Sequence, residues 1–91
     1  MTTVTTPWGK ATTLEEVTVP QRAGDRRFTT RVELLETVGG DRLVRFSYAS
    51  DGRARRGPVT LRVQDLARLR TQLVRADALR RALAEVAMDE T

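Results

Sequence analysis

The sequence predicts an α+β protein in which a four-stranded antiparallel β-meander precedes one long C-terminal α-helix, packed on one face of the sheet. Apolar and polar residues alternate in four short runs before residue 64, which is the period of half-buried strands. Connections rich in Gly, Asp and Arg separate these runs, as hairpin turns do. From Gln64 onward the apolar residues recur with the spacing of an amphipathic helix.

The composition restricts the possible functions. A chain of 91 residues is long enough for one domain with a modest core. It contains no cysteine and no histidine, which excludes disulfides, thiolate zinc sites and histidine-based catalysis. No segment has the pattern of a membrane span or an export signal, so we expect a cytoplasmic protein. Because no catalytic or phosphate-cradling motif is recognisable, we expect a protein that is not an enzyme and has no cofactor, metal or small-molecule substrate.

The strands follow a segment without apolar periodicity. Residues 1–13 hold six threonines and Trp8, so we expect a flexible tail there and a single domain over residues 14–91. The Gly39-Gly40 pair suits a tight turn between the second and third strands. The four strands are expected at Glu15–Val19, Phe28–Leu34, Val44–Tyr48 and Val59–Val63.

One helix is expected from about Gln64 to the C-terminus, because no Gly or Pro interrupts that stretch. The direction of its apolar stripe changes by roughly 80–90° near Ala76–Ala78. The helix therefore either bends there or buries its two halves against different surfaces. We expect the second half to contact a second copy of the chain in an isologous dimer. The expected interface residues are Leu79, Leu83 and Val86.

Six arginines are concentrated in the first and third connections of the meander. A meander places these two connections at the same end of the sheet. Together with Asp25 and Asp51 they carry a formal charge of +4, which equals the net charge of the whole chain. A confined basic edge is typical of polyanion binding, although solvated arginine-rich turns have the same composition. The arginines are Arg22, Arg26, Arg27, Arg53, Arg55 and Arg56.

The face of the sheet opposite the apolar one is also expected to be basic. Arg31, Arg45 and Arg62 alternate with the apolar residues of their strands and would suit a phosphate backbone. The alternative is that a sheet face exposed to water carries polar residues in any case. Glu16 and Glu33 lie on the same face and could neutralise two of the three arginines.

Few aromatic rings remain for stacking on bases. Phe28 and Phe46 fall in phase with the core, where Phe46 is expected to pack beside Leu61 on the adjacent strand. Tyr48, near a strand end, and Trp8, in the tail, are the rings that could stack on a nucleic acid.

Three consecutive stretches carry a family resemblance: Gly40–Tyr48, Asp51–Leu61 and the helix from Gln64. Their order of hairpin, strand, basic turn, strand and long helix resembles the C-terminal domain of positive cofactor four, a family of transcriptional coactivators that bind single-stranded DNA. The resemblance covers roughly residues 31–83. It implies a homodimer built through the helices that clasps DNA by backbone charge and ring stacking.

The resemblance also implies individual contacts. Arg42 matches the basic position after the family's first hairpin, and Arg55 and Arg56 match the basic pair before its last strand. Val38 and Leu66 stand where the family carries aromatic residues, at the hairpin and in the first helical turn.

The sequence thus predicts a small dimeric nucleic-acid-binding protein that favours single-stranded DNA and acts in transcription or DNA maintenance. The alternative is a protein-interaction module of the same fold that does not bind nucleic acid, which the missing family aromatics favour. The expected nucleic-acid contacts are Arg31, Arg42, Arg45, Arg53, Arg55, Arg56, Arg62, Tyr48 and Trp8.

Overall fold

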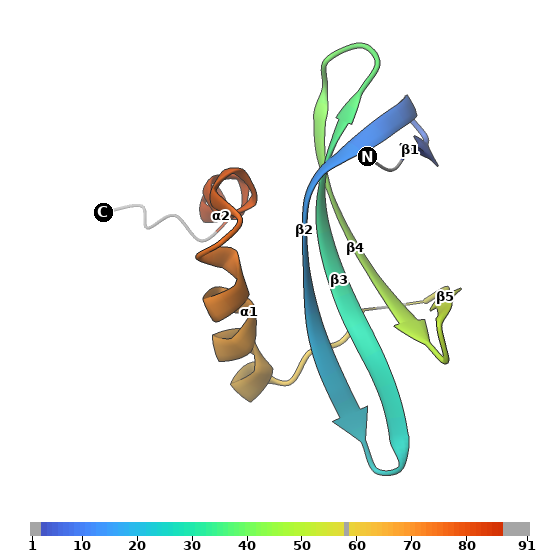
Figure 1. Cartoon of the computed structure of the whole chain (residues 1–91), viewed down its shortest axis with the longest axis vertical. Helices are drawn as coiled ribbons and strands as arrows, with labels where there is room; N and C mark the ends of the chain where they lie inside the picture. The colour runs from blue at the N-terminus through green and yellow to red at the C-terminus, as the bar shows by residue number, and fades with distance from the viewer. Residues whose placement is uncertain (1–2, 58, 87–91) are drawn as a thin grey trace.

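The computed structural model describes residues 3–57 and 59–86 as an α+β protein with a curled antiparallel sheet and two C-terminal α-helices (Figure 1). A short 3₁₀ helix precedes α1. The elements are β1 Thr3–Thr6, β2 Gly9–Ala23, β3 Arg26–Thr37, β4 Arg42–Ser50, β5 Arg53–Arg55, η1 Val63–Asp65, α1 Leu66–Leu73 and α2 Asp77–Ala84.

The five strands follow one another in the order β1-β2-β3-β4-β5, so every strand pairs with its neighbour in sequence and the predicted meander is confirmed. The strands β2 and β3 are the longest and pair from Ala11 opposite Thr37 to Ala23 opposite Arg26. A register shift between Thr13 and Glu15 marks a bulge, which bends β2. As Figure 1 shows, the start of β2 crosses over the sheet and carries β1 to the side away from the helices.

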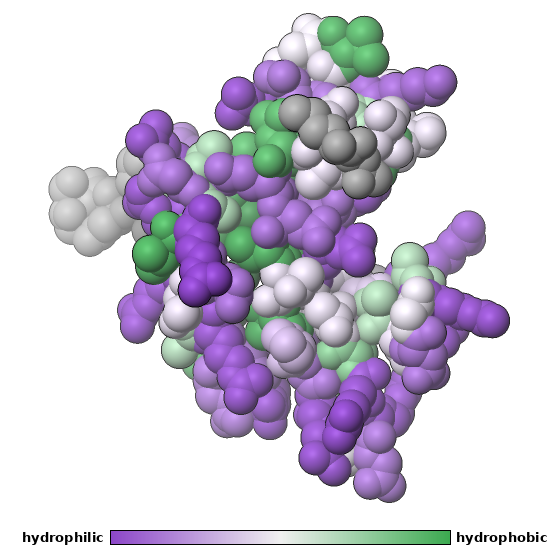
Figure 2. Space-filling view, viewed as in Figure 1, coloured by the Kyte–Doolittle hydropathy of each residue, from purple (hydrophilic) through white to green (hydrophobic). Residues whose placement is uncertain are grey.

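The main core lies between the helices and the strands β2 and β3. Val17, Val32 and Leu34 of the sheet pack there against Ala76 and Leu79. Leu79 is completely buried. In Figure 2, hydrophobic side chains lie between the helices and the sheet, while hydrophilic ones cover the lower end of the strands.

A second, smaller buried cluster lies on the other face of the sheet. Ala11 and Leu35 are buried there, where the β1–β2 hairpin folds over the strands. The adjacent residues Leu34 and Leu35 point to opposite faces, and both are buried because each face is covered at that level. The expectation that residues 1–13 form a flexible tail is wrong for residues 3–13, which lie in β1, its turn and the start of β2. Thr-rich segments fit strands as well as tails.

The fourth predicted strand is also wrong. Residues 59–62 have no regular secondary structure, and the last strand of the sheet is instead β5, which pairs with β4 from Tyr48 opposite Arg55 to Ser50 opposite Arg53. From β5 the chain crosses to the helices. Val59 and Leu61 are half-buried along this crossing, so their alternating apolar pattern reflects partial burial of these side chains and not pairing in a strand.

The single long helix is replaced by two. The break lies at the predicted change in the apolar stripe, where Ala76 has a non-helical backbone (φ −121°, ψ 76°), so the bend alternative is confirmed. The bend turns α2 so that Leu79 enters the core of its own chain, which corrects the expectation that Leu79 contacts a second copy. Leu83 packs partly against the same core, and Val86 is 85% exposed.

The expectation that Phe46 and Leu61 pack as core residues on adjacent strands is wrong. Phe46 is 44% exposed because the helices cover β2 and β3 and leave much of β4 open. Leu61 is half-buried outside the sheet.

Candidate nucleic-acid interface

The two arginine-rich connections meet at one end of the sheet, as the meander predicts. Arg26 and Arg27, beside the β2–β3 turn, line the same hollow as Asp51 and Arg55 of the β4–β5 hairpin. Asp51 and Gly52 both have positive φ (55° and 74°), which is the backbone that tight two-residue hairpins require. Short turns therefore hold both groups of arginines close to the strand ends.

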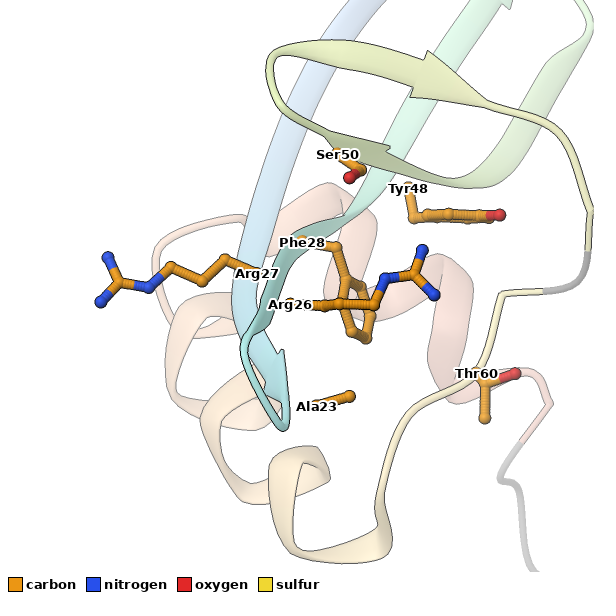
Figure 3. A pocket seen from close by; sticks show the side chains of 7 residues that line it. All are labelled: Ala23, Arg26, Arg27, Phe28, Tyr48, Ser50 and Thr60. Carbon is orange, nitrogen blue, oxygen red and sulfur yellow. The ribbon is translucent and has the colours of Figure 1, made fainter.

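A second hollow at this end contains two aromatic rings, and we name it the aromatic hollow. The rings of Phe28 and Tyr48 lie edge to face, with centroids 6.2 Å apart and planes at 77°. The volume is about 210 Å³. In Figure 3 the side chain of Arg26 extends across the hollow toward Tyr48, while Arg27 points away from it. The lining residues are Ala23, Arg26, Arg27, Phe28, Tyr48, Ser50 and Thr60.

Tyr48 is held in place by the segment after β5. Its hydroxyl donates a hydrogen bond to the backbone carbonyl oxygen of Arg56 at 3.0 Å. A Cβ atom on Gly57 would lie 3.6 Å from the same hydroxyl, and the φ of +123° at this residue strongly favours glycine. The ring is therefore oriented before any ligand binds.

Most of the loop arginines have no acidic partner in the described part of the chain. Arg55 lies 3.9 Å from Asp51 and donates to the backbone carbonyl oxygen of Ser50 at 3.3 Å. Among residues 3–57 and 59–86, no carboxylate lies within ion-pair distance of the other five. These five are Arg22, Arg26, Arg27, Arg53 and Arg56. The hollows at this end are therefore bordered by an excess of positive charge.

Arg62 lies at the same end of the molecule, on the helix side, in an ion pair with Asp65. Its Nε donates to Asp65 Oδ2 at 2.8 Å and its Nη2 donates to Oδ1 at 3.3 Å. Asp65 is buried and also accepts a hydrogen bond from Gln21 Nε2 at 3.2 Å, while Thr30 donates to the Gln21 side-chain oxygen. The hydrogen bond from Arg62 lowers the pKa of Asp65, against the opposing effect of burial, and Gln21 and the nearby Arg68 lower it further.

Arg31 and Arg45 lie elsewhere, on the face of the sheet away from the helices. Arg45 donates to Glu33 at 3.0 Å, and the Glu33 side chain is almost completely buried. Arg31 lies 3.8 Å from Glu16. The alternative in which the two glutamates neutralise these arginines is therefore confirmed.

Two further expected contacts lie near the other end of β4. Arg42 pairs with Glu36 at 3.4 Å. Trp8 is 66% exposed at the β1–β2 turn, beside Leu35 and Leu43. The structure therefore separates the expected contacts into three places, and only five of them gather at the arginine-loop end. These are Tyr48, Arg53, Arg55, Arg56 and Arg62.

The contacts expected from the sequence leave out four residues of this end: Phe28, Arg22, Arg26 and Arg27. The strand phase of Phe28 predicts a core position, yet Phe28 is half-buried and lines the aromatic hollow. The three arginines belong to the basic loops but are not among the expected contacts. For Arg26 and Arg27, the position next to Phe28 at the start of a strand is the signal that could place them at the site.

Comparisons with protein-family models, with characterised proteins and with solved structures give no match for this chain. The resemblance to positive cofactor four thus stays a prediction. Within the described part of the chain, no helix is long and apolar enough to cross a membrane, and no group of three or more acidic side chains is placed to hold a metal ion.

Proposed function

We propose that this protein binds nucleic acid, and single strands in preference to duplexes, at the arginine-loop end of its sheet. The observation that carries the proposal is the meeting of two arginine-rich turns beside the ring pair of Phe28 and Tyr48. Guanidinium groups attract the phosphate backbone regardless of sequence, and exposed ring surface offers a stacking platform for bases. Stacking requires unpaired bases, which is the reason for the preference for single strands.

The proposed contacts differ from those expected from sequence. Arg26, Arg53 and Arg56 supply charge with no described carboxylate within ion-pair distance, while Phe28 and Tyr48 supply the rings. Arg31 and Arg45 are outside the proposed site because their charges are compensated on the opposite face. A role in transcription or DNA maintenance is part of the proposal and rests on the family resemblance alone.

Fluorescence anisotropy with labelled oligo(dT) and with a duplex of equal length tests the proposal. Affinity should fall steeply as salt rises, because bound phosphates release counterions. Tyr48→Leu should weaken single-strand binding by about 1–3 kcal/mol, the value of one stacked base. Trp8→Leu, which removes a ring near the other end of the sheet, is the matched control and should leave the affinity unchanged. Absence of binding at low salt, or equal affinity for the duplex, would contradict the proposal.

A second candidate function, protein–protein interaction, is supported by the outer edge of β4. Only Tyr48–Ser50 pair with β5, so within the described residues the edge from Arg42 to Ser47 has no strand partner. Phe46, at 44% exposure, lies on this stretch. Open edges of this kind accept an added strand from another chain.

The proposed homodimer would use this edge or the exposed Val86 rather than Leu79. Light scattering at the protein concentrations of the binding assay measures the mass directly. If the mass is that of a dimer, Phe46→Asp should dissociate it when the β4 edge is the interface. Val86→Asp should do so when the end of α2 is the interface. A monomeric mass for the unaltered protein would contradict the homodimer while leaving the nucleic-acid proposal to its own test.

A further inference from the structure

A second basic hollow lies beside the β2–β3 turn, on the helix side, and we name it the arginine groove. Its volume is about 380 Å³. The residues come from β2, β3, the segment before η1 and the helix α1. They are Pro20, Gln21, Arg22, Arg27, Arg62 and Arg68.

The arginine groove carries a net positive charge. Among the residues that the structure describes, only Arg62 of these four arginines has an acidic partner, since Asp65 engages it through both carboxylate oxygens. In the described part of the chain, no carboxylate is within ion-pair distance of Arg22, Arg27 or Arg68. Three like charges around an open groove repel one another, and a bound anion would relieve that repulsion.

Two of these arginines are already positioned by backbone carbonyl groups. Arg68 Nη1 donates to the carbonyl oxygen of Pro20 at 3.5 Å, and Arg22 Nε donates to that of Gly24 at 3.0 Å. A guanidinium group has five N–H donors, so each contact leaves donors free for a ligand. Groups held in this way lose less conformational entropy when they bind phosphate oxygens.

The arginine groove and the aromatic hollow share one lining residue. Arg27 borders both of them. Figure 3 shows Arg26 extending across the aromatic hollow while its neighbour Arg27 points away from it. Successive arginines of β3 thus carry positive charge to both sides of the turn.

We propose that the arginine groove is a second phosphate subsite for the strand that occupies the aromatic hollow. This inference rests on the proposed function and extends its footprint: the sugar-phosphate backbone continues past the β2–β3 turn onto Arg22, Arg27 and Arg68. A strand long enough to cross the turn therefore binds more tightly than one that fills the aromatic hollow alone.

The experiment compares oligo(dT) of about 5 and about 16 nucleotides, which bracket the usual range for a small single-strand site. The double variant Arg22→Ser/Arg68→Ser removes two groove charges. It should weaken binding of the long strand roughly three- to thirtyfold, as expected for two exposed ion pairs, and affect the short strand much less. The salt slope for the long strand should fall by about 1.4 units.

The matched control is Arg70→Ser/Arg75→Ser, which removes the same charge from exposed positions outside the groove. It should leave both affinities close to those of the unaltered protein. Equal losses in the two double variants would overturn the inference, because the effect would then be one of net charge. Unchanged binding in Arg22→Ser/Arg68→Ser would overturn it as well, while the proposed function would stand. Failure of the unaltered protein to bind either strand would overturn the proposed function itself.

A second measurement does not depend on the folding of a variant. In the unaltered protein, the side-chain Nε–Hε NMR signals of Arg22 and Arg68 should shift when the long strand is added, and those of Arg70 and Arg75 should not. If a polyglutamate peptide shifts these two signals and the long strand does not, the groove is a site for acidic proteins and the inference is wrong.

Discussion

The Glu15 carboxylate on β2 caps the first turn of α2 by accepting a hydrogen bond from the backbone N–H of Leu79 at 2.7 Å. Its other oxygen accepts one from the N–H of Ala78 at 3.4 Å. The N-cap residue of α2 is Ala76, whose side chain has no acceptor. Glu15, 64 positions before Leu79 in the sequence, therefore satisfies donors that the helix leaves unpaired. The contact joins the sheet to the helix at the level of the core.

This contact predicts an unequal effect for two adjacent glutamates. Glu15→Ala should lower the free energy of unfolding by about 1 kcal/mol, as the loss of a helix cap usually does. Glu16→Ala, which removes only an exposed ion pair with Arg31, should lower it less. Urea unfolding of both variants measures the difference. Equal losses of unfolding free energy would contradict the prediction, because the cap by Glu15 would then add nothing beyond the effect of removing a negative charge.

The buried Asp65 predicts a dependence of stability on pH. Its pKa is lowered in the folded state, mainly by the hydrogen bond from Arg62. A carboxyl group of this kind stabilises the fold above its ordinary pKa, and the contribution is lost as pH falls through the lowered value. The difference in unfolding free energy between the unaltered protein and Asp65→Asn should thus be constant from about pH 7 to pH 5 and shrink below about pH 4.

The control for this pH dependence is Asp77, whose pKa is also lowered, first of all by its hydrogen bond with Arg80. Asp77 is exposed, and water screens its interactions, so Asp77→Asn should show the same window with a smaller amplitude. A pH-independent difference for Asp65→Asn would contradict the prediction.

The loop arginines predict a loss of affinity without a loss of stability. Replacing Arg53, Arg55 and Arg56 with Ser should flatten the salt slope for a single strand by up to about two units, and the melting temperature should barely change. Replacing Arg22, Arg26 and Arg27 should act in the same direction, because both groups lie at one end of the sheet. The measurement is binding of oligo(dT) at several salt concentrations.

A matched variant tests whether position or charge decides the effect of the loop arginines. Arg31→Ser/Arg42→Ser removes two exposed arginines that lie outside the proposed site and pair with glutamates. Its salt slope should stay close to that of the unaltered protein. If it flattens the slope as much per charge as the loop variants do, the binding follows net charge rather than the loop end.

Truncating Leu79 and truncating Phe46 should lower the stability of the protein by different amounts. Leu79→Ala should cost about 2–5 kcal/mol, because it opens a cavity in the fully buried core. Phe46→Ala should cost clearly less, on the order of 1 kcal/mol, since nearly half of the side chain is exposed. Thermal or urea unfolding measures both. A larger cost for Phe46→Ala would indicate that a partner covers β4.

Local patterns in the sequence determined the meander, the adjacency of the arginine loops and the break in the helix. Alternation with a period of two identifies the faces of β3 and β4, and short turn segments make neighbouring strands pair. The change of the apolar stripe near Ala76 was visible because the angular position of a residue on a helix follows from its number alone.

Only the tertiary structure decided which faces are covered. The β1–β2 hairpin folds over Leu35, the helices bury Leu79 and leave Phe46 open, and Glu33 neutralises Arg45. Periodicity tells which residues share a face of the sheet. It does not tell what packs on that face, since the segments that pack there come from distant parts of the chain. Arg22 and Arg68 are 46 positions apart in the sequence, and non-local packing likewise brings them to the same groove.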